Sequence, residues 1–259
     1  MKFIILCHPR TGSTLLIRAL GDHPDIRQGM EIFNPILEGN ARYVDWRKEA
    51  FTELYGKQDS YTDKIGYLDA DRFDLSLLAE RFFRDFNGTK IMYDQISTRS
   101  KAWLYIQSLE DLRVIILERN LVESAVSFRI AMQTDIWHIE NGSSNPPCPR
   151  MEYPLEFFGW FYDHFCAGAG EFAATFDESR IIRVNYRDLV TSWPATMQLI
   201  QSHLGIEPLE IPKAYEKRRR ERIEDLVVNY HNVRRHYSRH PVLARHFKTA
   251  DWMIGNNSP

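Results

Sequence analysis

The chain alternates short apolar runs with segments whose apolar residues recur every three or four positions. The clearest runs are Phe3-Ile-Ile-Leu-Cys7 and Val114-Ile-Ile-Leu117, and the second is rich in β-branched residues. Such runs are typical of strands that are covered on both faces in a parallel sheet. The whole pattern predicts strands at Lys2–Cys7, Lys90–Ile96, Arg113–Leu117 and Arg180–Val184.

Segments with helical periodicity lie between and after these runs, and one of them stops cleanly at Gly205. The predicted helices are Ser13–Leu20, Asp45–Tyr55, Ser76–Phe86, Ser100–Leu109, Leu121–Gln133, Pro154 to about Phe176, Thr191–Leu204 and a last helical region. Alternating strands and helices predict an α/β fold, with a central parallel sheet flanked by helices on both faces. Ligands of such folds bind outside the carboxyl ends of the strands.

The turn after the first strand, His8-Pro-Arg-Thr-Gly-Ser-Thr14, has the features of an anion-binding loop similar to a P-loop. A tight turn with one glycine leaves backbone N–H groups unpaired, and the following helix adds donors and the positive end of its dipole. A phosphate or a similar anion is the natural ligand of such a turn. The residues expected to bind it are Arg10, Thr11, Gly12, Ser13 and Thr14.

This turn differs from the phosphate-binding loop of nucleotidases. When Gly12-Ser13-Thr14 is aligned with the end of the nucleotidase pattern, Ser13 stands where the lysine should be and Cys7 where the first glycine should be. That lysine reaches the β- and γ-phosphates, whereas the charge here comes from Arg10. The turn therefore predicts anion binding and argues against ATP or GTP hydrolysis.

Composition and charge narrow the class of protein. The 259 residues are 44% hydrophobic and 26% charged, with a formal net charge of −2. These values are ordinary for a soluble globular protein and give no global field that attracts nucleic acid or a membrane. The first apolar run is too short for a signal peptide or a membrane span. We therefore expect a single cytoplasmic domain over residues 1–259, with no nucleic-acid partner.

The three cysteines, Cys7, Cys148 and Cys166, have no paired spacing. This pattern favours free thiols in a reducing compartment over a disulfide framework. The sequence contains no C-x-x-C or H-E-x-x-H motif, so it predicts no metal site.

A second candidate for anion binding follows the strand Arg113–Leu117. Arg119 stands at the carboxyl end of this strand, at the same edge of the sheet as the first turn. Ser127 lies eight residues later, about two helical turns on, and can face the same side. The two residues would suit a phosphate clamp. Taken alone, they are equally consistent with an Arg119–Glu123 pair on a helix surface and an ordinary helical serine.

The two segments together resemble the sulfotransferases that use 3′-phosphoadenosine-5′-phosphosulfate (PAPS). In that family, a strand followed by a turn like Pro9-Arg-Thr-Gly-Ser-Thr-Leu-Leu16 holds the 5′-phosphosulfate. An arginine and a serine eight residues later, here Arg119 and Ser127, hold the 3′-phosphate. Asn185-Tyr-Arg-Asp-Leu189 is similar to a further family segment, with Arg187 in place of an acidic residue. The resemblance runs from residue 1 to about residue 232.

A basic stretch stands where the family places a late lid over the 3′-phosphate. It consists of Lys217, Arg218, Arg219 and Arg220. The resemblance implies that at least one of the three arginines contacts the nucleotide, and position favours Lys217 and Arg218. Because acidic residues are interleaved with the run, it is also consistent with a solvated helix face.

Within the family, the chain resembles bacterial carbohydrate sulfotransferases of the nodulation-factor and trehalose type. The segments that carry this similarity are Asp22-His-Pro-Asp25, Gly29-Met-Glu31 and Gly88-Thr-Lys-Ile-Met-Tyr93. The resemblance implies in-line transfer of a sulfuryl group from PAPS to a hydroxyl of a carbohydrate or glycolipid-like acceptor, without a metal ion. Residues 32–75 and 134–152 are irregular and least like the shared core, so we expect them to build the acceptor site.

The resemblance also implies catalytic roles. Arg10 would neutralise the charge that builds on the bridging and sulfuryl oxygens. Glu31 is the first candidate for the general base, and its other interpretation is a solvated loop glutamate. Asp94 is the second candidate, because cytosolic members of the family place a catalytic histidine near this position. His8 and His23 are expected to be structural.

Two other functions remain open at this point. One is a nucleotide or nucleoside kinase with a degenerate loop, which would need magnesium and a nucleoside triphosphate. The other is a non-catalytic relative that binds the desulfated nucleotide without transferring a group. The aromatic residues near Phe157–Phe165 are expected to form core, because helical spacing explains them without a ligand.

Overall fold

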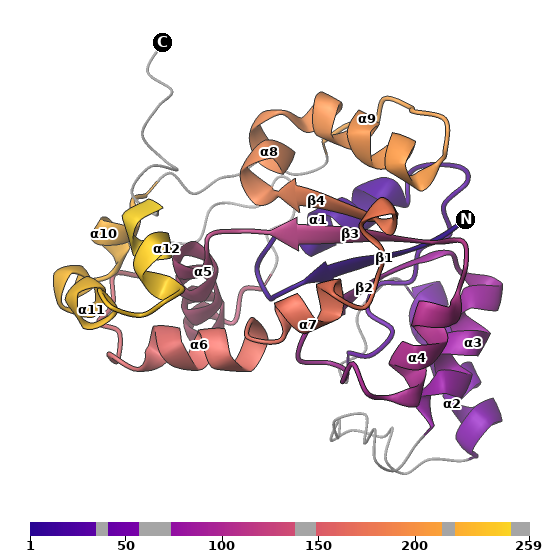
Figure 1. The fold of residues 1–259 in the computed structure, drawn as a ribbon, viewed down its shortest axis with the longest axis horizontal. Helices are drawn as coiled ribbons and strands as arrows, with labels where there is room; N and C mark the ends of the chain where they lie inside the picture. Colours follow the sequence, from indigo (N-terminus) through magenta and orange to yellow (C-terminus); the bar gives the residue numbers. More distant parts are fainter. Residues whose placement is uncertain (35–40, 57–73, 138–148, 214–220, 250–259) are drawn as a thin grey trace.

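The computed structural model describes residues 1–34, 41–56, 74–137, 149–213 and 221–249 (Figure 1). Its centre is a parallel sheet in the order β2-β1-β3-β4. The strands are β1 (Lys2–Cys7), β2 (Gly88–Met92), β3 (Leu112–Glu118) and β4 (Ile181–Asn185). The central strands, β1 and β3, are the two apolar runs of the sequence, and both are almost entirely buried. The predicted α/β fold with a central parallel sheet is confirmed.

Helices cover both faces of the sheet. The α-helices of the described residues are α1 (Ser13–Leu20), α2 (Ala41–Tyr55), α3 (Leu75–Asp85), α4 (Lys101–Ser108), α5 (Leu121–Thr134), α6 (Phe157–Phe165), α7 (Ala169–Ala173), α8 (Tyr186–Thr191), α9 (Trp193–Leu204), α10 (Ile223–Leu226), α11 (Tyr230–His236) and α12 (Leu243–Thr249). Figure 1 shows α9 on one side of the sheet, and α4 and α7 on the other.

Polar side chains fix where several of these helices begin. Asp74 caps α3, and Ser100 caps α4 through its hydroxyl, which accepts a hydrogen bond from the Trp103 N–H at 3.2 Å. The side-chain Oδ1 of Asn120 accepts from the backbone N–H groups of Val122 and Glu123 at the start of α5. Such caps satisfy donors that the first turn of a helix leaves unpaired. The Asn120 cap fixes the turn between β3 and α5, which carries Arg119.

The structure differs from the sequence prediction most clearly in three places. The single helix from Pro154 to about Phe176 is wrong: α6 ends near Cys166 and α7 begins after Gly168. Two glycines at this break, Gly168 and Gly170, each disfavour a continuous helix by about 1 kcal/mol. The strand predicted to reach Ile96 ends at Met92, because the Gln95 side chain accepts the Met92 N–H at 3.0 Å and turns the chain. Helix α8, directly after β4, was not predicted.

The segment Gln28–Glu31 runs beside the edge strand β2. Gln28 forms a parallel bridge with Gly88, and the Lys90 N–H donates to the Met30 carbonyl at 2.9 Å. This pairing extends the sheet beyond β2. It also brings Glu31 beside Lys90, although the two residues are far apart in the sequence.

The interior contains two hydrophobic clusters. The larger one surrounds the sheet. The second is built mainly from α5, α6 and the helices α10–α12, which lie beyond the carboxyl ends of the strands (Figure 1). The rings of Phe157, Phe158, Phe161 and Phe165 are buried in it, as predicted. Tyr162 is partly buried against this cluster, but Trp160, which was expected to be core as well, is 45% exposed. The carboxyl ends of β1 and β3 therefore face a second packed body, and the first predicted loop lies between the two.

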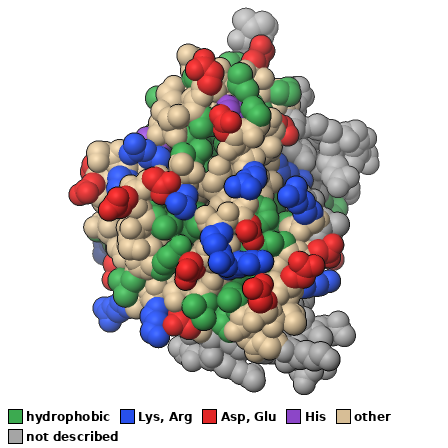
Figure 2. All heavy atoms as spheres, turned by 90° about the vertical axis from the view of Figure 1, so that its right-hand side faces the viewer, with side chains coloured by type: hydrophobic (Ala, Val, Ile, Leu, Met, Phe, Trp, Pro, Cys, Tyr) green, Lys and Arg blue, Asp and Glu red, His purple; other side chains and the backbone are tan. Residues whose placement is uncertain are grey.

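Basic and acidic side chains are interspersed on the face shown in Figure 2, without a large patch of one sign. This distribution agrees with the small net charge of the sequence. Within the described ranges, no helix is both long enough and apolar enough to span a membrane.

Candidate functional site

The first loop (residues 8–14) connects β1 to α1 in a strained conformation. Both Arg10 and Gly12 have positive φ angles, 67° and 88°. A Cβ atom at position 12 would lie 2.8 Å from ring atoms of Tyr186, so only glycine fits here without a shift. The Thr11 hydroxyl donates to the His8 carbonyl at 3.1 Å and holds the turn from inside.

The loop presents a row of backbone donors. The N–H groups of Thr11, Gly12, Ser13 and Thr14 donate no hydrogen bond to any described residue. They lie at the amino end of α1, where the helix dipole also favours negative charge. Unpaired donors of this kind are costly unless water or an anion satisfies them. The loop therefore fits a phosphate or phosphosulfate group.

Arg10, Arg119 and Ser127 come together beside this loop. The Arg119 Nη1 donates to the Arg10 carbonyl at 2.7 Å, and the Arg10 Nε donates to the Ser127 Oγ at 3.2 Å. The Arg119 Nε also lies 3.4 Å from the Glu123 carboxylate, so the alternative ion pair is present as well. The two predicted anion sites thus form one cationic cluster at the carboxyl end of the sheet.

Tyr186 is a residue of this site that the sequence did not single out. Its ring packs on Gly12, and the Arg119 guanidinium carbon lies 4.2 Å from the ring centroid. Such a cation–π contact orients the guanidinium plane. The sequence signal for Tyr186 was the similarity of Asn185-Tyr-Arg-Asp-Leu189 to a family segment. That similarity did not predict that the tyrosine ring packs against the first loop.

Glu31 is buried, with 2% of its surface exposed, so its interpretation as a solvated loop glutamate is wrong. Its Oε1 forms an ion pair with the Lys90 ammonium, and its Oε2 accepts from the Gln95 amide at 2.7 Å. Lys90 also donates to the Thr14 hydroxyl at 2.8 Å. These contacts define the Glu31 network (Glu31, Lys90 and Gln95), which joins the candidate base to the first loop.

Lys90 and Gln95 were missed at the sequence level. A lysine inside an otherwise buried strand was the available signal, because a buried ammonium requires a partner. The sequence could not identify that partner, which arrives through the pairing of Gln28–Glu31 with the edge of the sheet.

Asp94, the second candidate base, lies in the turn directly after β2 and is exposed. Partial loss of solvent raises the pKa of its carboxyl, and the negative charge of Glu31 adds to this shift. The two candidate bases thus have different environments. The Glu31 carboxylate is buried and paired with Lys90, whereas Asp94 is exposed.

The histidines near the loop have structural surroundings. His8 is buried, its Nδ1 lies 3.0 Å from the Pro9 carbonyl, and its ring packs edge-on against Phe161. Burial lowers the pKa of His8 to about 4, so the ring is neutral at pH 7. His23 is also buried, and its Nε2 lies 2.9 Å from the Glu207 carbonyl.

The cysteines that the structure describes, Cys7 and Cys166, are free and buried. Burial raises the pKa of the Cys7 thiol to about 11 and also raises that of Cys166. Both therefore remain protonated at neutral pH and pack as apolar side chains.

Some predicted residues lie outside the described ranges. These are the basic stretch Lys217–Arg220, Cys148 and most of the predicted acceptor segments. Trp137, in the described part of one such segment, has a ring that is 39% exposed, and its carbonyl accepts from the Arg10 Nη1 at 2.6 Å. Among the described residues, no group of three or more His, Cys, Asp or Glu side chains is placed to hold a metal ion.

Comparison with known proteins finds similar sequences and solved structures. Nodulation protein H of Rhizobium meliloti (strain 1021) is 27% identical, over 96% of each chain. Nodulation protein H of Rhizobium tropici is 25% identical, over 96% of this chain and 94% of the other. Among solved structures, a sulfotransferase from Alicyclobacillus acidocaldarius is 13% identical with a TM-score of 0.49, over 98% of this chain and 95% of that one.

The family model of the sulfotransferase family matches residues 3–210. The match contains the first loop, the Glu31 network and the Arg119–Ser127 pair, which are the elements that the structure assembles at one end of the sheet. This chain belongs to the sulfotransferase family.

Proposed function

We propose that this sulfotransferase binds PAPS across the first loop and the Arg119–Ser127 pair, and sulfates a hydroxyl of a carbohydrate or glycolipid-like acceptor. PAPS is the donor of the family, and when bound it supplies the sulfuryl group that is transferred. The observation that carries the proposal is the row of unpaired N–H groups from Thr11 to Thr14, directly beside the clustered Arg10 and Arg119.

The residues of the site suit a nucleotide that carries two anionic ends. The backbone of the first loop would hold the 5′-phosphosulfate, since it supplies donors and the helix dipole at one point. Arg119 and Ser127 would hold the 3′-phosphate. Arg119 is already oriented by Tyr186 and by the Arg10 carbonyl, so little side-chain freedom is lost on binding.

Two cations would stabilise the developing charge. Arg10 lies inside the loop, and Lys90 touches the loop through Thr14. A loose in-line transfer places negative charge on the leaving phosphate and the transferred group, where fixed cations act most strongly. The arrangement thus supplies by side chains the charge that nucleotide kinases obtain partly from magnesium.

Glu31 is the proposed general base. The ammonium of Lys90 and the amide of Gln95 each engage one of its oxygens, and each oxygen keeps a further lone pair for a proton. These two contacts fix the carboxylate, and Lys90 connects it to Thr14 of the first loop. The acceptor hydroxyl would pass its proton to this carboxylate as the new O–S bond forms.

The acceptor class rests on the family resemblance and on one local feature. The exposed ring of Trp137 lies 6.0 Å from the Arg10 guanidinium carbon. A flat aromatic ring beside the reacting groups suits the face of a sugar ring.

A transfer assay with radiolabelled PAPS tests this proposal. The full chain is incubated without metal and with neutral oligosaccharides, glycolipids or simple phenols as acceptors. Label is expected on at least one carbohydrate-containing acceptor, and Trp137→Ala, which keeps the backbone carbonyl, is expected to raise the acceptor KM. Label on phenols alone would contradict the acceptor class, and binding without any transfer would favour a non-catalytic relative.

A further inference from the structure

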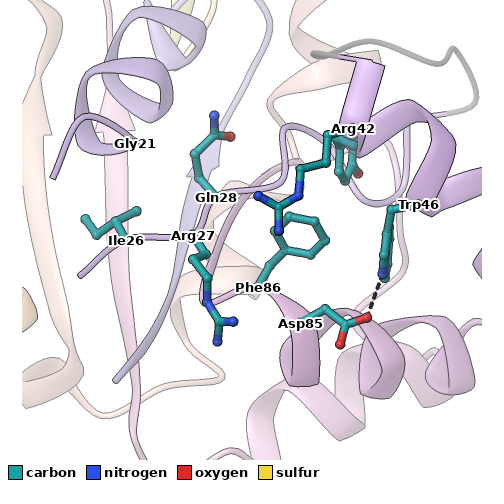
Figure 3. Close-up of a pocket in the computed structure, with 9 residues that line it drawn as sticks. Gly21, Ile26, Arg27, Gln28, Arg42, Trp46, Asp85 and Phe86 are labelled. Carbon is teal, nitrogen blue, oxygen red and sulfur yellow. Dashed lines mark hydrogen bonds between the residues drawn. The ribbon is translucent and has the colours of Figure 1, made fainter. Parts of the chain in front are cut away.

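A cavity of about 420 Å³ lies away from this site, beside α2 and the amino end of β2 (Figure 3). The residues that matter for its chemistry are Arg27, Gln28, Arg42, Trp46, Asp85 and Phe86. None of them belongs to the first loop, the Glu31 network or the Arg119–Ser127 pair. Arg42 and Trp46 stand in the segment 32–75 that was expected to build the acceptor site, and here they line a separate cavity. The size is in the range of small-molecule sites.

The charge of this cavity is positive. Among the described residues, neither the Arg27 nor the Arg42 guanidinium has an ion-pair or hydrogen-bond partner. The carboxylate of Asp85 is already engaged, because it accepts from the Trp46 indole N–H at 2.6 Å and lies 3.3 Å from the Arg81 Nε. Both arginines are exposed, so water can solvate them, and an anionic ligand could replace that water at both guanidinium groups.

Gln28 adds an unsatisfied acceptor. Its Oε1 is buried and has no hydrogen-bond partner among the described residues. The side chain lies against Gly21, where an added Cβ would be 2.8 Å from the Gln28 Cγ. A buried polar atom without a partner is destabilising, and a ligand hydroxyl that reached this oxygen would satisfy it.

An aromatic surface completes the cavity. The rings of Trp46 and Phe86 pack edge-to-face with centroids 5.0 Å apart, and both are only half-buried. Since Asp85 fixes the indole N–H, the Trp46 ring has a defined orientation (Figure 3). Such a surface offers an apolar contact for a ring with a flat face.

We propose that this cavity is a second binding site, which takes an anionic sugar. The guanidinium groups of Arg27 and Arg42 bind its sulfate, phosphate or carboxylate, a hydroxyl donates to Gln28, and the sugar ring contacts Trp46 and Phe86. The proposal does not depend on how the first loop binds its nucleotide.

Calorimetric titration of the full chain with glucose 6-sulfate, glucose 6-phosphate, glucuronate and neutral glucose tests it. At least one charged sugar is expected to bind saturably and glucose is not, and the series identifies the preferred anion. Arg27→Gln and Arg42→Gln should each weaken binding about tenfold, the effect of one lost charge-assisted hydrogen bond. Arg84→Gln, an exposed α3 arginine that does not line the cavity, is the matched control and should leave binding unchanged.

A second readout separates this cavity from the nucleotide site. Sugar binding is expected to change tryptophan fluorescence in the native chain and not in Trp46→Phe, and adenosine 3′,5′-bisphosphate is expected not to compete. The proposal is overturned if no charged sugar binds, if both arginine variants bind as the native chain does, or if the bisphosphate displaces the sugar.

Discussion

At the scale of single residues, Lys90 connects the two halves of the proposed chemistry. It carries a positive charge into the middle of a buried strand and is only 1% exposed. A buried ammonium is tolerated when it is paired and hydrogen-bonded, and here one ammonium contacts both Glu31 and Thr14. One side chain therefore fixes the position of the candidate base relative to the anion-binding loop.

The Glu31 carboxylate should matter for turnover and not for donor binding. Glu31→Gln keeps the size of the side chain but removes the base, so turnover should fall about 100-fold or more while the Kd for adenosine 3′,5′-bisphosphate changes little. Asp94→Asn is the matched control and should retain most activity. If Asp94→Asn abolishes turnover and Glu31→Gln retains it, Asp94 is the base. Thermal unfolding must accompany both assays, since an unpaired Lys90 destabilises the fold by about 3–5 kcal/mol.

Arg119 should contribute directly to nucleotide affinity. Arg119→Ala is expected to weaken bisphosphate binding by at least about 1.5 kcal/mol, the low end for a hydrogen bond to a charged group. Arg113→Ala removes an exposed arginine from β3, the strand that precedes Arg119, and should have no effect on affinity. Equal affinities of the two variants in calorimetry, with intact folds, would remove Arg119 from the site.

At the scale of elements, the turn from β1 to α1 is the part of the site most strictly set by backbone geometry. It contains two positive φ angles within three residues, and the Tyr186 ring packs directly on its glycine. The same ring supports Arg119, so β4 and α8 contribute to the loop and to the cationic cluster together.

A side chain at position 12 should therefore disturb both parts. Gly12→Ala places a Cβ against the Tyr186 ring and forces an L-residue to a φ of 88°, which costs about 1–2 kcal/mol from the backbone alone. We expect lower stability and weaker bisphosphate binding. At Gly170 a Cβ would meet nothing within 4 Å, so Gly170→Ala serves as the control. Native-like affinity of Gly12→Ala would mean that the loop is not the nucleotide site.

The elements predicted well from sequence are those whose signals are local. The strands β1 and β3 are continuous apolar runs, and the loop and Arg119 follow them directly, so their meeting at one sheet edge was predictable. The Glu31–Lys90 pair was not, because it depends on an irregular segment that pairs with the sheet edge far along the chain. The break between α6 and α7 was also missed, although its glycines were visible. The extent of the domain over residues 1–259 stays a prediction.

At the scale of the whole molecule, the site lies where the sheet meets the second hydrophobic cluster. His8 stands at this junction, buried at the end of β1 and packed on Phe161 of α6. Because the two packed bodies meet around the first loop, conditions that loosen the junction should affect both stability and nucleotide binding.

Lowering the pH should destabilise the junction between the sheet and the second cluster by protonating His8. Burial lowers the pKa of His8 from 6.5 to about 4, so between these values the unfolded chain binds a proton that the folded chain does not. The stabilisation from neutral His8 is complete above pH 6.5 and is lost as the pH falls toward 4, by about 3 kcal/mol. Urea unfolding across this range should be less pH-dependent in His8→Gln than in the native chain. His231→Gln, at an exposed site, should not change the dependence, and an unchanged slope in His8→Gln would refute this account.

The measurement that tests the central claim most directly is calorimetric titration with adenosine 3′,5′-bisphosphate in the presence of a metal chelator, beside ATP with magnesium. The first loop lacks the nucleotidase lysine and is coupled to an arginine cluster that suits a 3′-phosphate. We therefore predict tight binding of the bisphosphate without metal and little binding of ATP. Preference for ATP with magnesium, and no binding of the bisphosphate, would contradict the assignment of the first loop and of Arg119.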